Sequence, residues 1–273
     1  MEQGWDIMCG ICGCSGSDDN TSNNQDNVQS LHRFNHGKIS ELKLDKIQHS
    51  EQKHIEQHLL HANDHRAMHN RETLQKQFIL ALNLVSSPGS GKTTLLEQTL
   101  KVMHPTQSCY VIEGDQQTLQ DAQRIAETGV DTVQVNTGAG CHLDAQMVAQ
   151  GMQQFDMERG GFLFIENVGN LVCPALFDLG EAAKVAVISV TEGEDKPLKY
   201  PHMFKASQLM IINKMDLLPY VPFDVDKCIA YARQVNPNIQ VIKLSALKQD
   251  GMDQWFSWLR QARESIFSLP SAI

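Results

Sequence analysis

The chain has 273 residues, of which 41% are apolar and 20% charged, as is ordinary for a globular protein. Its formal net charge of −9 argues against broad nucleic-acid binding, which needs lysine and arginine clustered against phosphates. No run approaches the ~18 apolar residues of a membrane span, and the first twenty residues show no signal peptide. We therefore expect a cytoplasmic globular protein with neither a nucleic acid nor a membrane as partner.

Cysteine and histidine gather near the N-terminus. Cys9, Cys12 and Cys14 lie within six residues, and eight of the eleven histidines lie between His32 and His69. An odd number of cysteines, seven, in a chain with no export signal is unsuited to a disulfide framework. The pattern favours metal binding or thiol chemistry.

Three regions are expected along the chain. Residues 1–39 are predicted to be a flexible metal-binding head and polar linker, because residues 15–29 contain Val28 as their only apolar residue and cannot offset the entropy of ordering. Residues 40–77 contain no proline or glycine and predict a helical, histidine-rich segment. Residues 78–273 are expected to form the main domain.

From residue 79 onward, short apolar runs alternate with amphipathic segments. Continuous apolar strands alternating with helices predict a three-layer α/β fold with a mostly parallel sheet covered on both faces. The predicted strands are 79–85, 109–112, 132–135, 162–165, 185–190, 209–212 and 239–244. The predicted helices are 92–103, 119–127, 142–155, 226–235 and 253–267.

A phosphate-binding loop is predicted between the first strand and the first helix. The segment SSPGSGKTT matches the pattern G-x-x-x-x-G-K-S/T except at its first glycine, which is Ser86. Backbone N–H groups and the helix N-terminus would hold phosphates, Lys92 would reach the β- and γ-phosphates, and the Thr93 hydroxyl would bind Mg²⁺. A Gly-Ser turn with a surface lysine fits the strand–loop–helix context less well. The predicted loop residues are Pro88, Gly89, Ser90, Gly91, Lys92, Thr93 and Thr94.

The base is predicted from two later strand ends. The segment NKMD follows one apolar strand, and its carboxylate can accept guanine N1–H and N2–H₂, a donor pair that adenine lacks. The segment SAL follows the next strand, where a backbone N–H could meet guanine O6. These features favour guanine, through Asn213, Lys214, Asp216, Ser245 and Ala246.

Two acidic strand ends are candidates for the magnesium side of the phosphates. Asp115 ends the segment EGD, and Glu166 with Gly169 forms an E-x-x-G element resembling the D-x-x-G element of GTPases. Asp115 and Glu166 are expected to hold Mg²⁺ directly or through water, and with Lys92 and Thr93 they form the predicted catalytic set. The alternative for either carboxylate is a capping role at a strand end.

A second metal site is predicted at Cys141 and His142, which open a predicted helix, together with Cys173, seven residues after Glu166. Two cysteines and one histidine suit Zn²⁺ or Ni²⁺ with a fourth position open. The alternative for Cys173 is a small buried apolar side chain. Metal ligands beside a γ-phosphate element indicate that nucleotide and metal affinity are linked.

Five histidines at helical spacing form a stripe along the second region. The stripe either chelates Ni²⁺ or Zn²⁺ or is a solvated polar helix face, and the sequence leaves both interpretations open. Its members are His54, His58, His61, His65 and His69.

Together these motifs resemble the HypB family of nickel-incorporation GTPases, which act in NiFe-hydrogenase maturation. The resemblance extends from about residue 63 to the C-terminus and includes the segments LVSSPGSGKTT, GAGCHLDA, FIENVGNLVCPA, TEGEDKPLKYP and NKMD. The urease nickel GTPases are similar, but the Cys-His loop and the N-terminal cysteines point away from them.

The resemblance implies a low-turnover GTPase that uses GTP and Mg²⁺, forms a GTP-dependent homodimer, and carries Ni²⁺ to the hydrogenase large-subunit precursor with a HypA-type nickel chaperone. The family's G-domain ligands for Ni²⁺ or Zn²⁺ map onto Cys141, His142 and Cys173. Its N-terminal nickel motif, C-x-x-C-x-C, maps onto Cys9, Cys12 and Cys14, although here seven residues precede the Met8 that adjoins the motif.

The expected function is therefore a GTP-hydrolysing nickel metallochaperone in which nucleotide state is coupled to metal release. The alternatives are a nickel or zinc storage protein with incidental GTPase activity, a urease-type nickel GTPase, and a small-molecule P-loop kinase.

Overall fold

The computed structural model describes residues 31–35, 38–42, 50–115, 120–137, 140–157 and 159–267. These residues fall into two compact units that divide between Leu59 and Leu60. The first unit contains an antiparallel hairpin of β1 (Leu31–Asn35) and β2 (Lys38–Leu42). The sequence did not predict this hairpin. Cys9, Cys12, Cys14 and the polar linker lie outside the described residues.

Helix α1 (Ser50–Lys76) is shorter at its N-terminal end than the helix expected from residue 40. From Leu60 onward it belongs to the second unit. Its buried side chains recur at intervals of four, three and four residues, which places them on one helix face: Asn63, Ala67, Asn70 and Leu74. His61, His65 and His69 are exposed, and the side chains of His54 and His58 lie outside the described part of the chain.

The second unit is built on a seven-stranded sheet with the order β5-β4-β6-β3-β7-β8-β9. Every neighbouring pair in this sheet is parallel. The predicted fold class is therefore confirmed. The strands are β3 (Ile79–Ser86), β4 (Cys109–Asp115), β5 (Asp131–Asn136), β6 (Gly161–Gly169), β7 (Ala183–Ser189), β8 (Leu209–Asn213) and β9 (Gln240–Lys243).

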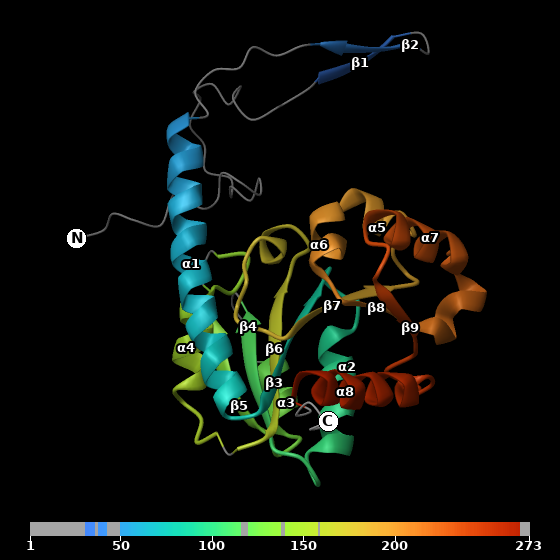
Figure 1. Ribbon diagram of the computed structural model, residues 1–273. Coiled ribbons are helices and arrows are strands. Elements are labelled where there is room, and N and C mark those ends of the chain that lie inside the picture. Colours follow the sequence, from blue (N-terminus) through green and yellow to red (C-terminus); the bar gives the residue numbers. More distant parts are fainter. Residues whose placement is uncertain are drawn as a thin grey trace, which may run out of the picture. The chain divides into compact units, whose positions relative to one another are not determined.

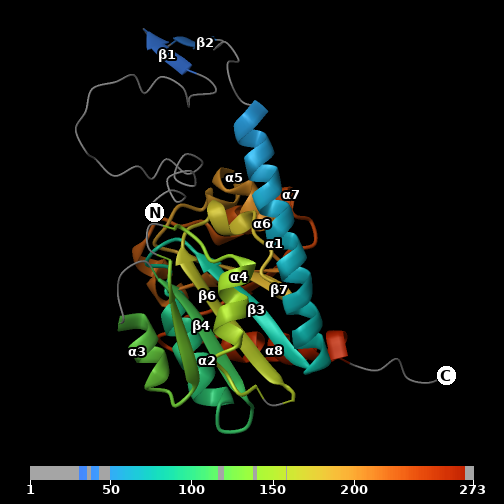
Figure 2. The same cartoon turned by 90° about the vertical axis from the view of Figure 1, so that its left-hand side faces the viewer.

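Helices cover both faces of the sheet (Figures 1 and 2). The helices α2 (Lys92–Met103), α3 (Gln120–Ala126) and α8 (Met252–Phe267) pack on one face. The other face is covered by α1, α4 (Ala145–Met152), α6 (Pro201–Ala206) and α7 (Val225–Val235). Shorter elements are α5 (Lys196–Lys199) and the 3₁₀ helices η2 (Cys173–Ala175) and η3 (Met215–Tyr220). Among the described helices, none is both long and apolar enough to cross a membrane.

Side chains alternate between the two faces along the central strands. On β6, Phe162 and Phe164 belong to the core under α2 and α8, whereas Leu163 and Ile165 belong to the core under α1 and α4. The same alternation continues to the polar end of β6. It places residue 166 on the α2 face and residue 167 on the α1 face.

Candidate functional site

The predicted phosphate loop joins β3 to α2. Gly89 and Gly91 both have left-handed backbone conformations, with φ of +75° and +91°. A Cβ atom at Gly91 would lie 2.5 Å from Asn213 Nδ2, so this close approach requires glycine. Asn213 Nδ2 donates to the Ser90 carbonyl at 2.9 Å, and Lys214 Nζ donates to the Gly89 carbonyl at 2.6 Å. The loop is therefore held by the element that was predicted to select the base.

The predicted base-selecting residues lie together at the carboxyl ends of β8 and β9. Asn213 Oδ1 accepts from the backbone N–H groups of Lys214 at 2.8 Å and Ala246 at 3.0 Å. Asp216 Oδ1 accepts from Ser245 Oγ at 2.6 Å. Two separate strand ends are thereby fixed as one unit, with the Asp216 carboxylate oriented by a hydroxyl.

Glu166 is the centre of the phosphate end of the site. Its Oε1 accepts from Lys92 Nζ at 2.6 Å and from Thr93 Oγ1 at 2.5 Å, and the residue is 1% exposed. Gly169 lies against the loop, because a Cβ atom there would be 3.2 Å from Pro88 Cγ. The structure thus brings together the lysine, the hydroxyl and one of the two predicted carboxylates. Thr94 follows on α2, where its Oγ1 accepts from Arg124 Nη2 at 3.4 Å.

A second buried carboxylate, Glu113, was not selected by the sequence analysis. It lies beside Glu166 in the register of β4 and β6, while Asp115 ends β4 two residues later. Burial, with Glu166 and Asp115 adding repulsion, raises the pKa of Glu113 to about 8. Glu113 Oε2 and Glu166 Oε2 are buried without a hydrogen-bond partner among the described residues. Two such oxygens beside a threonine hydroxyl fit Mg²⁺, which prefers oxygen ligands.

We expect Glu113→Gln to stabilise the magnesium- and nucleotide-free protein, and to do so more strongly as pH rises from about 5 to 8. The folded state holds the Glu113 proton with a pKa of about 8, against the ordinary value of 4.5 for a solvated glutamate. The free energy of unfolding of the wild type therefore falls as the pH rises over this interval. The glutamine variant avoids roughly 2–4 kcal/mol of that decrease, because its side chain does not titrate. Urea unfolding in EDTA at several pH values measures the difference. The exposed Glu127→Gln is the control, and parallel pH slopes for wild type and Glu113→Gln would contradict the expectation.

The segment TEGEDKP, which entered the sequence analysis only through the family resemblance, contacts the phosphate loop. Glu192 Oε2 accepts from Ser87 Oγ at 2.5 Å and pairs with Lys196 Nζ at 3.1 Å. Glu192 Oε1 accepts from the Ser189 backbone N–H at 3.1 Å. Glu192 therefore holds the start of the loop against the end of β7.

Cys141, His142 and Cys173 come together as predicted. Their candidate ligand atoms lie within 4.8 Å of one another, and Cys141 Sγ is 3.7 Å from His142 Nδ1. Burial lowers the pKa of His142, which favours the neutral imidazole that binds metals. The expected helix start at residue 142 is wrong, because α4 begins at Ala145, after the cap Asp144. Cys141 and His142 therefore lie in the preceding loop, of which residues 138–139 are outside the described part.

No other group of three histidine, cysteine, aspartate or glutamate side chains gathers this closely among the described residues. His65 and His69 contact each other edge to face with ring centroids 4.7 Å apart, but both are exposed. Cys109 and Cys228 are buried, and burial raises the pKa of each thiol to about 12. These two thiols therefore belong to the core of the described domain.

Helix α1 binds both segments that carry the candidate metal ligands. Asn63 Oδ1 accepts from the Ala145 N–H at 2.9 Å, and Asn63 Nδ2 donates to the Asp178 carbonyl at 2.8 Å. Asn70 Nδ2 donates to the carbonyls of Ala145 at 2.8 Å and Leu179 at 3.0 Å. Ala145 follows His142 by three residues, and Asp178 follows Cys173 by five. The two asparagines therefore tie these segments to one helix.

Comparison with known proteins decides the family. Residues 80–243 match the family model described as "CobW/HypB/UreG, nucleotide-binding domain". The chain is 60% identical over 209 residues to hydrogenase maturation factor HypB of Escherichia coli (strain K12). This alignment covers 77% of this chain and 72% of that relative. The chain belongs to the HypB family.

Solved HypB structures have the same fold. HypB from Helicobacter pylori in complex with nickel is 35% identical with a TM-score of 0.72, covering 78% of this chain and 100% of that one. HypB from Archaeoglobus fulgidus is 36% identical with a TM-score of 0.69, covering 74% of this chain and 98% of that one. The family predicted from the motifs is confirmed. Residues 80–243, which match the family model, include the candidate nucleotide site and the Cys141, His142 and Cys173 cluster. Ser245 and Ala246 lie beyond the matched range.

Proposed function

We propose that this HypB-family chain is a GTP-hydrolysing nickel metallochaperone that delivers nickel to the hydrogenase large-subunit precursor, with nucleotide state coupled to metal release. One observation carries the coupling. The end of β6 contacts both candidate sites, since Glu166 binds Lys92 and Thr93 while Asn170 Nδ2 donates to the Cys141 carbonyl at 3.4 Å. A change at the phosphate end can therefore reach the metal loop over a few residues.

The nucleotide roles follow from the contacts of the loop. Lys92 and the loop amides would hold the phosphates, and Thr93 with Glu166 and Asp115 would hold Mg²⁺, with Glu113 now a further candidate. Mg²⁺ would neutralise charge on the phosphates during hydrolysis. Asn213 and Asp216 would select guanine, in line with the nucleotide-binding domain of the family model.

Nickel is the cargo in this proposal. Cys141, His142 and Cys173 would hold exchangeable Ni²⁺ or Zn²⁺, with a fourth position open to water, a HypA-type chaperone or the second copy of a GTP-dependent homodimer. The N-terminal cysteines would capture nickel. The nickel complex of the Helicobacter pylori relative supports this choice of metal.

The proposal is tested by nickel stoichiometry and dissociation rate in nucleotide-free, GDP-bound and GTP-analogue-bound protein. We expect the dissociation rate of one nickel ion to differ between the GDP and GTP-analogue states by about fivefold or more, the lower end of ordinary coupling energies. Lys92→Ala is the control, because it should lose the nucleotide response and keep the metal.

Equal release in all three states would overturn the coupling. Binding of several ions through the histidine stripe, with nucleotide-independent release, would instead support the storage function. Reconstitution of apo-hydrogenase and apo-urease with the nickel-loaded protein separates the hydrogenase role from the urease-type alternative.

A further inference from the structure

We propose that Asn167 is a positioning residue that transmits nucleotide state to the metal ligands through a buried relay formed by Asn83, Glu181 and Lys184. This inference rests on the proposed coupling of nucleotide state to metal release and names the side chains through which that coupling passes. None of the four belongs to the predicted nucleotide or metal ligands.

The relay starts where β6 ends. Glu166 and Asn167 are consecutive and therefore point to opposite faces of the sheet. Glu166 contacts Lys92 and Thr93 on the α2 face. On the α1 face, Asn167 Oδ1 accepts from the Leu143 backbone N–H at 3.2 Å, and Leu143 adjoins His142. A shift of the strand end on phosphate binding moves both side chains together.

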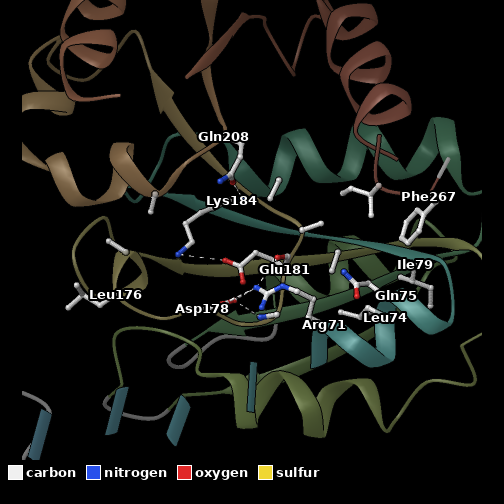
Figure 3. Close-up of a pocket in the computed structure, with 17 residues that line it drawn as sticks. Arg71, Leu74, Gln75, Ile79, Leu176, Asp178, Glu181, Lys184, Gln208 and Phe267 are labelled. Atoms are coloured by element: carbon white, nitrogen blue, oxygen red, sulfur yellow. Dashed lines mark hydrogen bonds and ion pairs between the residues drawn. The ribbon is translucent and has the colours of Figure 1, made fainter. Parts of the chain in front are cut away.

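From Asn167 the hydrogen bonds continue across the sheet. Asn167 Nδ2 donates to Asn83 Oδ1 at 3.2 Å, and Asn83 Nδ2 donates to Glu181 Oε1 at 3.0 Å. Lys184 Nζ lies 3.6 Å from Glu181 Oε1 and is the register partner of Asn83 between β3 and β7. Figure 3 shows Lys184 and Glu181 side by side in the wall of a cavity of about 510 Å³.

Lys184 completes the relay at the other metal ligand. Its Nζ donates to the carbonyls of Pro174 at 2.7 Å and Phe177 at 3.2 Å. Pro174 adjoins Cys173, and the Phe177 ring packs on His142 with centroids 3.9 Å apart. The relay therefore touches the chain next to both His142 and Cys173, and a change in its geometry alters their separation.

The burial of the relay separates it from an ordinary surface network. Asn83, Asn167, Lys184 and Glu181 are 0%, 1%, 5% and 8% exposed. Buried polar groups are costly unless each keeps its partner, so breaking one bond forces its neighbours to rearrange. Such a chain favours discrete arrangements over continuous deformation, as a two-state switch requires. Apolar side chains would fill these positions if packing were their only role.

The test measures the ratio of nickel dissociation rates in the GDP-bound and GTP-analogue-bound states of the full chain. We expect Asn167→Ala to bring this ratio close to one while nucleotide affinity and nickel stoichiometry stay within about threefold of wild type. Asn63→Ala is the matched control. It removes two of the four hydrogen bonds by which α1 holds the same two segments and does not touch β6. It should therefore change nickel release equally in both states and keep the ratio.

The outcomes separate the two proposals. A wild-type ratio of one overturns the proposed coupling, and this inference with it. If the ratio in Asn167→Ala equals that of the wild type, the relay alone is overturned. The relay alone is also overturned if the ratio falls as much in Asn63→Ala as in Asn167→Ala. If Asn167→Ala does not fold, the double variant Glu181→Gln/Lys184→Met removes the far end of the relay without leaving an unpaired buried charge, and its ratio decides in the same way.

Discussion

Replacing Asp216 with asparagine is expected to weaken GTP binding by about 100-fold or more, from the loss of two hydrogen bonds to a charged group. The carboxylate can accept both guanine N1–H and N2–H₂, whereas the amide of the variant offers one acceptor and one donor. Xanthine has a carbonyl in place of the guanine amino group and fits that pair. The variant should therefore prefer xanthosine triphosphate.

Competition against a fluorescent guanine nucleotide, with GTP, xanthosine triphosphate and ATP as competitors, measures this change. The fold should survive, because the asparagine keeps the oxygen that accepts from Ser245 Oγ. Asp226→Asn, at an exposed carboxylate in the first turn of α7, is the control and should leave the preference unchanged. Retained GTP preference in Asp216→Asn would contradict the assigned base contact, and a wild-type preference for ATP would favour the kinase alternative.

Cys141→Ser is expected to weaken nickel binding at the G-domain site by about 100-fold or more while leaving GTP binding intact. A thiolate is a far better ligand for nickel than a serine hydroxyl, and changes even beyond the ligands of metal sites commonly cost 10- to 100-fold. The change should be made in a chain whose Cys9, Cys12 and Cys14 are serine, so that the N-terminal motif does not mask it. Thiolate-to-nickel absorption and chelator competition are the measurements.

Cys228→Ala is the matched control for the lost thiol. Its thiol is buried on α7, and burial raises its pKa to about 12, so it supplies no thiolate at neutral pH. Nickel affinity in this variant should equal that of the parent. Unchanged nickel affinity in Cys141→Ser would remove Cys141 from the site.

The fold could be predicted in detail because its strands are buried on both faces. Runs such as ILALNLV and FLFI are short, apolar and bounded by turn residues, as is typical of strands covered on both faces, and the segments between them have helical periodicity. The hairpin of β1 and β2 was missed because residues 31–42 lack a strong apolar alternation. The short helices α5 and α6 were missed because four to six residues show no helical period.

Site residues within a recognisable motif could be predicted, and those defined by tertiary contacts could not. Lys92, Thr93 and Glu166 follow from the loop and strand patterns. Asn83 was visible only as an amide inside an apolar strand, and its partners lie 84 and 98 residues away in the chain. Glu113 gave a similar signal, since it follows the apolar run YVI. An isolated polar residue in a buried strand therefore indicates a partner without naming it.

The two asparagines of α1 bear on where this chain can be cut. A fragment starting at residue 78, where the GTPase domain was expected to begin, would keep the phosphate loop, the predicted base contacts and all three candidate metal ligands. It would nevertheless leave four backbone groups that now bind Asn63 and Asn70 without those partners: the N–H of Ala145 and the carbonyls of Ala145, Asp178 and Leu179. A truncated protein can thus keep every candidate ligand and still lose the geometry that would hold the ion. We therefore expect the smallest unit that binds nucleotide to be shorter than the smallest unit that binds metal.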